Sequence, residues 1–378
     1  MVKSHPQISV IMAVYNGEKF LEEAIGSILK QTFSNFEFII IDDGSEDTSL
    51  KIIKNFKDKR ISILENNKNI GLSASLNKGI KLSKGKYIAR MDADDISLPE
   101  RLEKQYNFME RNPNIGIVGT GYHLINESGE RMGTYIYPDN PVTIHWKLLT
   151  GPIFPHPTVM LRKKVLIENN LFYNEEYFVT QDYELWCRMI QFSEGSNLPQ
   201  ALIQYRAHDQ SKSKAESDKQ EQLRVKVSAE SLVNIYQIPH ITMEQTAIIG
   251  VIVNSDISSL KKIDLEKVNK IFFHVLGKFR KNISSSKSLI NNWQLNNMLP
   301  LIIQLEKLLI NTSLSKEEDR VLYLNYLFKL SSCNISVWFI HLFSEFKLFI
   351  YYPFWLIQLI KYLIGRQLSM VRINSIFI

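Results

Sequence analysis

Three aspartates stand almost side by side at Asp92, Asp94 and Asp95, directly after the apolar segment 87–91. Carboxylates this close repel one another in water, whereas a divalent cation between them removes that repulsion, and hard carboxylate oxygens suit Mg²⁺ or Mn²⁺. Such a cation takes one or two protein carboxylates and leaves positions for phosphate oxygens. The other interpretation is a solvated loop in which Asp95 or Ser97 caps the following helix.

A second acidic pair, Asp42 and Asp43, ends the apolar segment 36–41 and opens the turn Gly44-Ser45. A carboxylate at this place can accept hydrogen bonds from the N–H group of a base or from ribose hydroxyls. A turn followed by a helix N-cap explains the same residues, and the two roles are compatible.

A single carboxylate, Asp182, precedes the apolar and aromatic segment 183–190. A lone carboxylate beside a cleft can take a proton from an acceptor hydroxyl as a general base. Capping of the helix predicted over 183–190 is the competing role.

Two histidines are further candidates. His208, in Tyr205-Arg206-Ala207-His208, can be a third metal ligand, and Arg206 can meet a diphosphate. His208 can instead be hydrogen-bonded only. His156 lies between two prolines, where it either approaches an acceptor or shapes the loop.

The elements that must position these residues alternate along the first half of the chain. Short apolar segments rich in β-branched residues predict strands at 8–14, 36–41, 61–64, 87–91 and 115–119. Helical spacing of apolar residues separates them, as over 73–82. This alternation predicts a mostly parallel sheet flanked by helices, an α/β fold, with ligands beyond the carboxyl ends of the strands. Tyr15, Asp42, Asp43 and the three aspartates all fall at that edge.

The composition narrows the function classes. The 378 residues carry a net charge of +6, and Cys187 and Cys333 are too few for a disulfide framework or a zinc knuckle. The polar N-terminus has no apolar signal region, so a cytoplasmic protein is expected. No Gly-x-Gly-x-x-Gly follows the first strand and no phosphate-binding P-loop occurs, which argues against a dinucleotide enzyme and a P-loop NTPase. The basic residues do not line a polar face, which argues against nucleic-acid binding.

Taken together, five ordered segments resemble the inverting family 2 glycosyltransferases of the GT-A fold, of the type that builds bacterial cell-surface polysaccharides. They are residues 9–17, 27–32, 41–45, 91–95 and 181–186, and the match spans about residues 6–210. The resemblance implies that residues 1–115 form the nucleotide-sugar half of the domain and 116–210 the acceptor half. A helical extension is expected over 211–334.

The resemblance also implies roles for single residues. Ala13 and Tyr15 would lie against the base, and Asp43, with Asp42 beside it, would bind the base edge. Asp94 and Asp95 would hold the metal and the ribose, with Asp92 and His208 as further metal candidates. Asp182 would be the catalytic base, preceded here by Gln181 where the family often has Glu. His156 and Trp186 are expected in the acceptor region.

The resulting hypothesis is a Mn²⁺- or Mg²⁺-dependent transfer from a nucleoside-diphosphate sugar, UDP-linked by default, to a saccharide or lipid-linked saccharide. A nucleotidyltransferase is one alternative, although Tyr15-Asn16-Gly17-Glu18 stands where its Gly-rich basic loop would be. A catalytically silent scaffold of a polysaccharide assembly is another. A receiver-type phosphoacceptor explains Asp42 and Asp43 but not the second cluster.

The last part of the chain, 335–378, is predicted to form amphipathic helices that associate with a membrane. Residues 348–364 are apolar and aromatic, yet contain Pro353, Gln358 and Lys361. This favours a helix lying on the inner face of the cell membrane rather than crossing it. Packing on the catalytic domain or on a second copy of the chain is the alternative.

Overall fold

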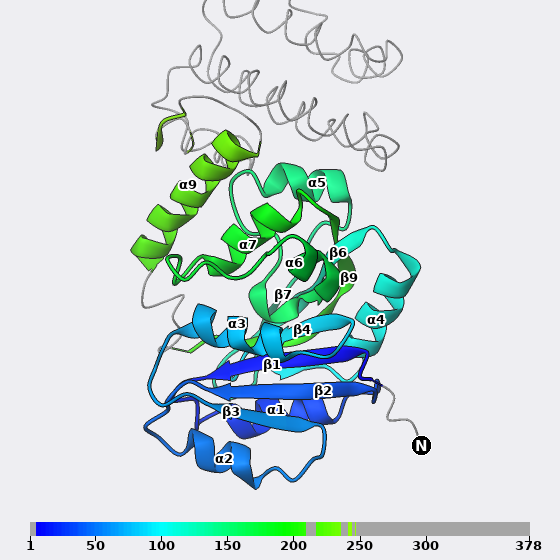
Figure 1. Ribbon diagram of the computed structural model, residues 1–378, viewed down its shortest axis with the longest axis vertical. Coiled ribbons are helices and arrows are strands. Elements are labelled where there is room, and N and C mark those ends of the chain that lie inside the picture. Colours follow the sequence, from blue (N-terminus) through cyan, green and yellow to red (C-terminus); the bar gives the residue numbers. More distant parts are fainter. Residues whose placement is uncertain (1–4, 209–216, 236–240, 244–245, 247–378) are drawn as a thin grey trace, which may run out of the picture. The chain divides into compact units, whose positions relative to one another are not determined.

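The computed structural model describes residues 5–208, 217–235, 241–243 and 246 (Figure 1). The membrane-associating segment expected at 335–378 and most of the extension expected at 211–334 lie outside these residues. Within the described part of the chain, no helix combines the length and the apolar character that crossing a bilayer requires.

One sheet organises the described residues, with the strand order β3-β2-β1-β4-β8-β6-β9-β5 and with β7 paired to β6. Its first four strands run parallel, as the alternation of elements predicts. They are β1 (Ile8–Val14), β2 (Phe36–Asp42), β3 (Ile61–Glu65) and β4 (Tyr87–Met91). The expected α/β fold is therefore present, and this half supplies the loops that carry Tyr15, Asp42 and Asp43.

The other half of the sheet is mixed rather than parallel. The short strand β8 (Met160–Arg162) lies antiparallel between β4 and β6 (Ile115–Ile125). Strand β9 (Glu194–Arg206) runs parallel to β6, while β5 (Ile96–Ser97) and β7 (Arg131–Tyr135) add antiparallel pairs. Parallel pairing thus covers only part of the sheet.

Strand β6 continues six residues beyond the predicted end at Gly119. Gly119 and Gly121 look like strand breakers in the sequence, but they lie where neighbouring chains approach closely. A Cβ at Gly119 would lie 2.2 Å from Asn197 Oδ1, and one at Gly121 would lie 2.4 Å from the Tyr135 carbonyl oxygen. These glycines permit close pairing of β6 with β9 and β7.

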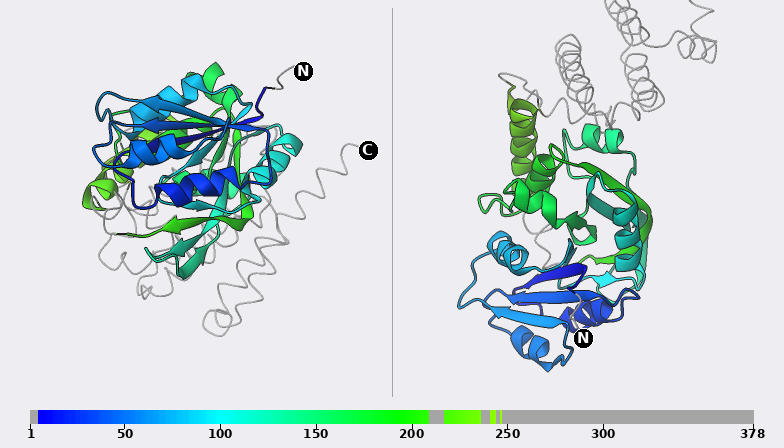
Figure 2. Two further views of the ribbon diagram at one scale, coloured as in Figure 1. Left: turned by 90° about the horizontal axis from the view of Figure 1, so that it is seen from below. Right: turned by 45° about the vertical axis from the view of Figure 1, so that its right-hand side comes forward.

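Two buried clusters cover the two faces of the sheet, because successive strand residues point to opposite sides. Val10 and Met12 of β1 face one cluster, which includes Leu21 and Ile25 of α1 (Leu21–Leu29). Ile11 faces the other, with Leu76 of α3 (Leu72–Leu82). Helices α1 and α3 accordingly lie on opposite faces (Figures 1 and 2).

The remaining helices follow the same division. They are α2 (Ser49–Asn55), α4 (Arg101–Arg111), α5 (Pro141–Lys147), α6 (Lys163–Glu168), α7 (Gln181–Met189), α9 (Ser217–Asn234) and the 3₁₀ turn η1 (His156–Thr158). Helix α4 has Glu100 as its N-cap residue, so neither Asp95 nor Ser97 caps it. The purely structural explanation of Asp95 as a helix cap is therefore wrong.

Candidate functional site

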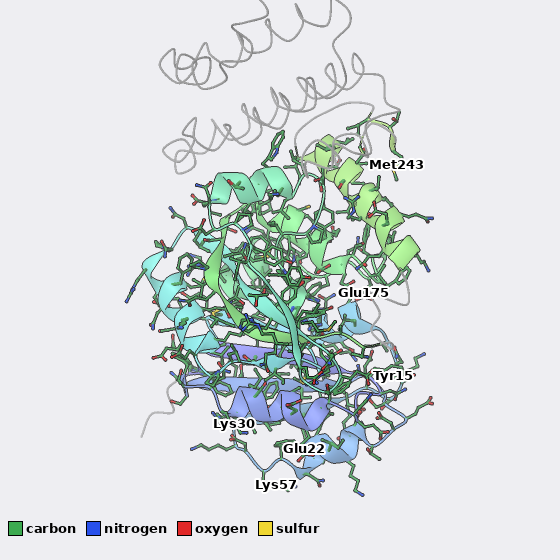
Figure 3. The ribbon with its side chains drawn as sticks, turned by 180° about the vertical axis from the view of Figure 1, so that it is seen from behind. Tyr15, Glu22, Lys30, Lys57, Glu175 and Met243 are labelled. Carbon is green, nitrogen blue, oxygen red and sulfur yellow. The ribbon has the colours of Figure 1, made fainter. Side chains whose placement is uncertain are left out.

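The loops after β1, β2 and β4 meet at one edge because the strands are parallel and in register. Val14 pairs with Asp42, and Met12 pairs with Met91. The Asp43 amide donates to the Val14 carbonyl oxygen at 2.7 Å, which extends the pairing into the loops. Tyr15 leaves the end of β1, and in Figure 3 it lies on the same side of the molecule as Glu175 of the segment before α7.

The first two loops are tied together by side chains. Asn16 has a φ of 51°, and its amide donates to Ser45 Oγ at 3.1 Å. In return, the Glu46 amide donates to Asn16 Oδ1 at 2.8 Å. The Gly17 amide donates to Ser49 Oγ at 2.9 Å. These hydrogen bonds therefore join the loop that carries Tyr15 to the loop that carries Asp43.

The residues expected at the base differ in accessibility. Tyr15 is 45% exposed and Ala13 is half-buried at the end of β1. Asp43 is 3% exposed, and its carboxylate accepts hydrogen bonds from Asn66 Nδ2 at 2.8 Å and from the Ile70 and Gly71 amides, each at 3.0 Å. Asp43 thus fixes the segment that leads into α3, a role that its sequence context did not indicate.

Asp42 and Gly44 flank that residue. Asp42 is buried; its Oδ2 accepts from the Ser45 amide at 3.3 Å, and its Oδ1 has no hydrogen-bond partner among the described residues. Gly44 has a φ of +72°, and a Cβ there would lie 2.5 Å from the Lys68 carbonyl carbon. This position therefore requires glycine.

The three aspartates after β4 do come together. One carboxylate oxygen from each of Asp92, Asp94 and Asp95 lies within 4.8 Å of the others. His208 joins them, with its Nε2 atom 2.9 Å from Asp94 Oδ2. Three hard oxygen donors and one imidazole nitrogen fit Mn²⁺ or Mg²⁺.

The electrostatics of the cluster support the same fit. Asp95 is buried, its Oδ1 accepts from the Arg206 amide at 2.9 Å, and its Oδ2 has no hydrogen-bond partner within the described residues. Burial, followed by the charges of Asp94 and Asp92, raises the pKa of Asp95 well above its usual range. Burial also raises the pKa of Asp92, against the opposing charge of Arg90. A cation would relieve this repulsion.

Arg90 is a functional candidate that the sequence analysis missed. It lies in β4, is buried, and forms an ion pair with Asp92. Its Nη1 atom makes this ion pair, whereas its Nε atom has no hydrogen-bond partner in the part of the chain that the structure describes. A charged residue inside the apolar segment 87–91 was the available signal, because a buried guanidinium requires a partner.

Asp182 lies in the first turn of α7 rather than before it, because the helix begins at Gln181 and Thr180 is the N-cap residue. The Tyr183 amide donates to Asp182 Oδ1 at 2.8 Å. Burial raises the pKa of Asp182 to about 6, and the nearby charge of Arg90 acts in the opposite direction. Arg90 therefore acts electrostatically on both the aspartate cluster and Asp182.

His156 lies beside Trp186, and Trp186 belongs to α7, as Asp182 does. His156 Nε2 lies 2.9 Å from the hydroxyl oxygen of Tyr173, and burial followed by the charge of Arg90 lowers the pKa of His156 well below its usual value. Trp186 is fully buried, with its ring centroid 6.1 Å from that of His156 and 6.4 Å from that of Tyr173. Trp186 thus packs edge-to-face against both of these rings. Tyr173 had no signal in the sequence.

Arg206 is placed differently from the expected contact with diphosphate. Its side chain is 3% exposed, and its guanidinium forms hydrogen bonds to the protein. The three aspartates and His208 thus share this edge. The charge of Arg90 links them to a second group, formed by Asp182, His156 and Tyr173.

Comparisons with known proteins point to one family. The family model described as Glycosyl transferase family 2 matches residues 9–169. An uncharacterized glycosyltransferase of Haemophilus influenzae is 32% identical over 282 residues, which cover 72% of this chain and 84% of that protein. The O-antigen biosynthesis glycosyltransferase WbnJ of Escherichia coli is 41% identical over 219 residues, covering 55% of this chain and 82% of WbnJ.

A solved structure shares the fold. The crystal structure of Staphylococcus aureus TarS 1–349 in complex with UDP-GlcNAc has a TM-score of 0.51 and 18% sequence identity, covering 85% of this chain and 91% of that one. This likeness confirms the expected GT-A arrangement of the sheet.

Proposed function

From membership of the glycosyl transferase family 2, to which this chain belongs, we propose that the enzyme moves a sugar from a nucleoside-diphosphate sugar to a hydroxyl of a saccharide or lipid-linked saccharide, with inversion. The observation that carries this proposal is the convergence of Asp92, Asp94, Asp95 and His208 at one strand edge, in electrostatic contact with Asp182.

The aspartate cluster would hold Mn²⁺ or Mg²⁺ through Asp94, Asp95 and His208, with Asp92 as a further ligand. A cation bound there supplies positive charge that offsets the charge developing on the leaving nucleoside diphosphate. The unpartnered Asp95 oxygen and the repulsion among the three carboxylates support this assignment. Asp94 would also contact the donor nucleotide.

Asp182 would act as the general base. Its carboxylate takes the proton from the acceptor hydroxyl while that oxygen attacks the anomeric carbon from the side opposite the diphosphate. The bond from the anomeric carbon to the phosphate oxygen breaks, and its electron pair leaves with the nucleoside diphosphate. One base is sufficient, because no covalent sugar–enzyme intermediate forms.

Tyr15 and Ala13 would lie against the base of the donor, and Asp42 and Asp43 would contact its edge or order the loop that does so. The exposure of Tyr15 at the end of β1 supports the first contact. The crystal structure of TarS holds UDP-GlcNAc in a related fold, which makes UDP sugars the first donors to test.

The acceptor would enter from the side of His156 and Tyr173, with Trp186 behind them. WbnJ acts in O-antigen biosynthesis, and this relation supports a role in cell-surface polysaccharide synthesis. A peripheral position on the inner face of the cell membrane is part of the proposal, and it depends on the sequence of residues 348–364 alone.

Calorimetric titration tests the proposal directly. UDP, dTDP, GDP and CMP are titrated into the full chain with and without Mn²⁺, and into Asp94→Ala. We expect one nucleotide to bind only with metal, and this binding to be lost in Asp94→Ala. If none of the nucleotides binds, the proposal is contradicted and the scaffold alternative gains support. Release of free pyrophosphate during turnover would indicate a nucleotidyltransferase.

A further inference from the structure

Arg206, the last residue of β9, contacts three separate segments through one buried guanidinium group. Its Nε atom donates to the Asp94 carbonyl oxygen at 2.9 Å, in the loop that carries the aspartates. Its Nη1 atom donates to the Glu127 carbonyl oxygen at 3.0 Å, in the turn between β6 and β7. Its Nη2 atom donates to the Glu23 carboxylate of α1 at 2.5 Å. One side chain therefore joins the aspartate loop, the β6–β7 turn and the first helix.

These contacts leave little of the arginine available for a ligand. The guanidinium carbon lies 4.5 Å from the centroid of the Phe20 ring, and Nη1 also donates to the Asn126 carbonyl oxygen at 3.4 Å. A diphosphate would have to displace several of these buried contacts. Arg206 is therefore built into the scaffold of the site.

Arg206 also holds the aspartate loop through its own backbone. Its amide donates to Asp95 Oδ1 at 2.9 Å. The aspartate loop is therefore held at the Asp95 carboxylate as well as at the Asp94 carbonyl oxygen. His208 follows two residues later, with its ring centroid 5.4 Å from that of Phe20. Phe20 thus contacts both Arg206 and His208.

The arrangement requires the shape of arginine and not only its charge. A guanidinium presents five donors in a rigid planar fork, whereas a lysine ammonium is a compact charge on a flexible stem. A lysine can approach Glu23, but it cannot also reach the carbonyl oxygens of Asp94 and Glu127 in their present directions.

We propose that Arg206 is a positioning residue for the cation site, and that it holds the Asp94 carboxylate and the His208 imidazole where both can bind one divalent cation. The inference rests on the proposed function, because it requires a cation at this cluster. It assigns Arg206 to the support of the metal ligands, and not to the donor diphosphate.

The test uses Mn²⁺ alone as the probe, with the free ion measured by electron paramagnetic resonance during titration of the full chain. Arg206→Met and Arg206→Lys remove the fork, and Glu23→Gln weakens one of its contacts while keeping the arginine. Arg131→Met is the control, because Arg131 is exposed and its guanidinium donates to Thr134 Oγ1. Circular dichroism confirms that each variant is folded.

We expect the Kd for Mn²⁺ to rise roughly tenfold or more in both Arg206 variants, as when an outer-shell partner of a metal ligand is lost. Glu23→Gln should shift it in the same direction by less, and Arg131→Met should leave it unchanged. An unchanged Kd in folded Arg206→Met and in Glu23→Gln would overturn the proposal. So would a loss of nucleotide binding at saturating Mn²⁺ in Arg206→Lys with normal Mn²⁺ affinity, because the arginine would then contact the diphosphate.

Asp94→Ala separates this inference from the proposed function. If the wild-type chain binds Mn²⁺ and Asp94→Ala does not, the cation site is confirmed. The Arg206 variants then test the positioning role on its own. If the wild-type chain binds no Mn²⁺, the cation site fails and the positioning role fails with it.

Discussion

The Nε2 atom of His208 lies 2.9 Å from the Oδ2 atom of Asp94, although 114 positions separate the two residues in the chain. The first belongs to the segment after β9 and the second to the loop after β4. Their pairing places a nitrogen donor beside a cluster of carboxylates, and it makes His208 the most informative single residue for testing the cation site.

His208→Ala should weaken Mn²⁺ binding roughly tenfold or more, because one donor of the set is lost while the carboxylates remain. His123→Ala is the matched control, since His123 is half-buried and its Nδ1 atom lies 2.9 Å from Thr134 Oγ1. Calorimetry with Mn²⁺ measures both variants. Equal affinity in the two would show that His208 is only hydrogen-bonded to Asp94.

Asp182→Asn should lower the rate of transfer by about two or more orders of magnitude while nucleotide binding persists, because an amide cannot accept the acceptor proton. The same assignment predicts the pH profile of the wild-type enzyme. Burial raises the pKa of Asp182 to about 6, and only the ionised carboxylate is a base. The rate should therefore fall about tenfold per pH unit below that value. A profile that stays flat down to pH 4.5 would exclude Asp182 as the base.

The same raised pKa predicts a gain in stability for Asp182→Asn. A carboxyl group that binds its proton more tightly in the folded chain favours folding below its unfolded pKa of 3.8, and this contribution is lost as the pH rises through about 6. At pH 7.5 the wild-type chain is therefore less stable than the variant by about 3 kcal/mol. Thermal unfolding should show a higher Tm for the variant at pH 7.5 and equal Tm values near pH 4. Asp139→Asn, at an exposed position, is the control for the loss of one charge.

Gly44→Ala should destabilise the fold by about 3 kcal/mol, because a positive φ is combined with a backbone clash. Gly129→Ala is the matched comparison, since its φ of +84° carries the backbone cost but no described atom lies within 4 Å of the added carbon. That variant should lose only about 1 kcal/mol. Urea unfolding of both variants measures the difference, and similar losses would mean that the contact with Lys68 is relieved without cost.

Much of the fold of residues 1–115 follows from local pattern. The apolar segments that became β1, β2 and β4 each end in polar residues, and parallel pairing brings such ends to one edge whatever the details of the loops. Parallel pairing alone therefore predicts that Asp42, Asp43 and the three aspartates lie at the same edge of the sheet. The start of α7 was missed by two residues, because Gln181 and Asp182 are polar and do not continue the apolar periodicity.

The rest of the site depends on pairings between distant segments, which periodicity does not specify. The antiparallel insertion of β8 between β4 and β6 follows from long-range packing of a three-residue strand. The partners of Arg206 come from α1 and from the β6–β7 turn, so its burial was hidden and a ligand contact was the natural expectation. Tyr173 was missed for the same reason, since its hydroxyl matters only through His156.

The position of β9 in the sheet has a consequence for synthesis of the protein. It is the last strand of the described chain, yet it lies between β6 and β5, and its end delivers Arg206 and the segment with His208 to the aspartate loop. A chain still emerging from the ribosome can form β1 to β4 and all three aspartates before this strand is available. A nascent or prematurely terminated polypeptide would then hold the three aspartates without Arg206 and His208, so that the proposed cation site is completed only after β9 has docked.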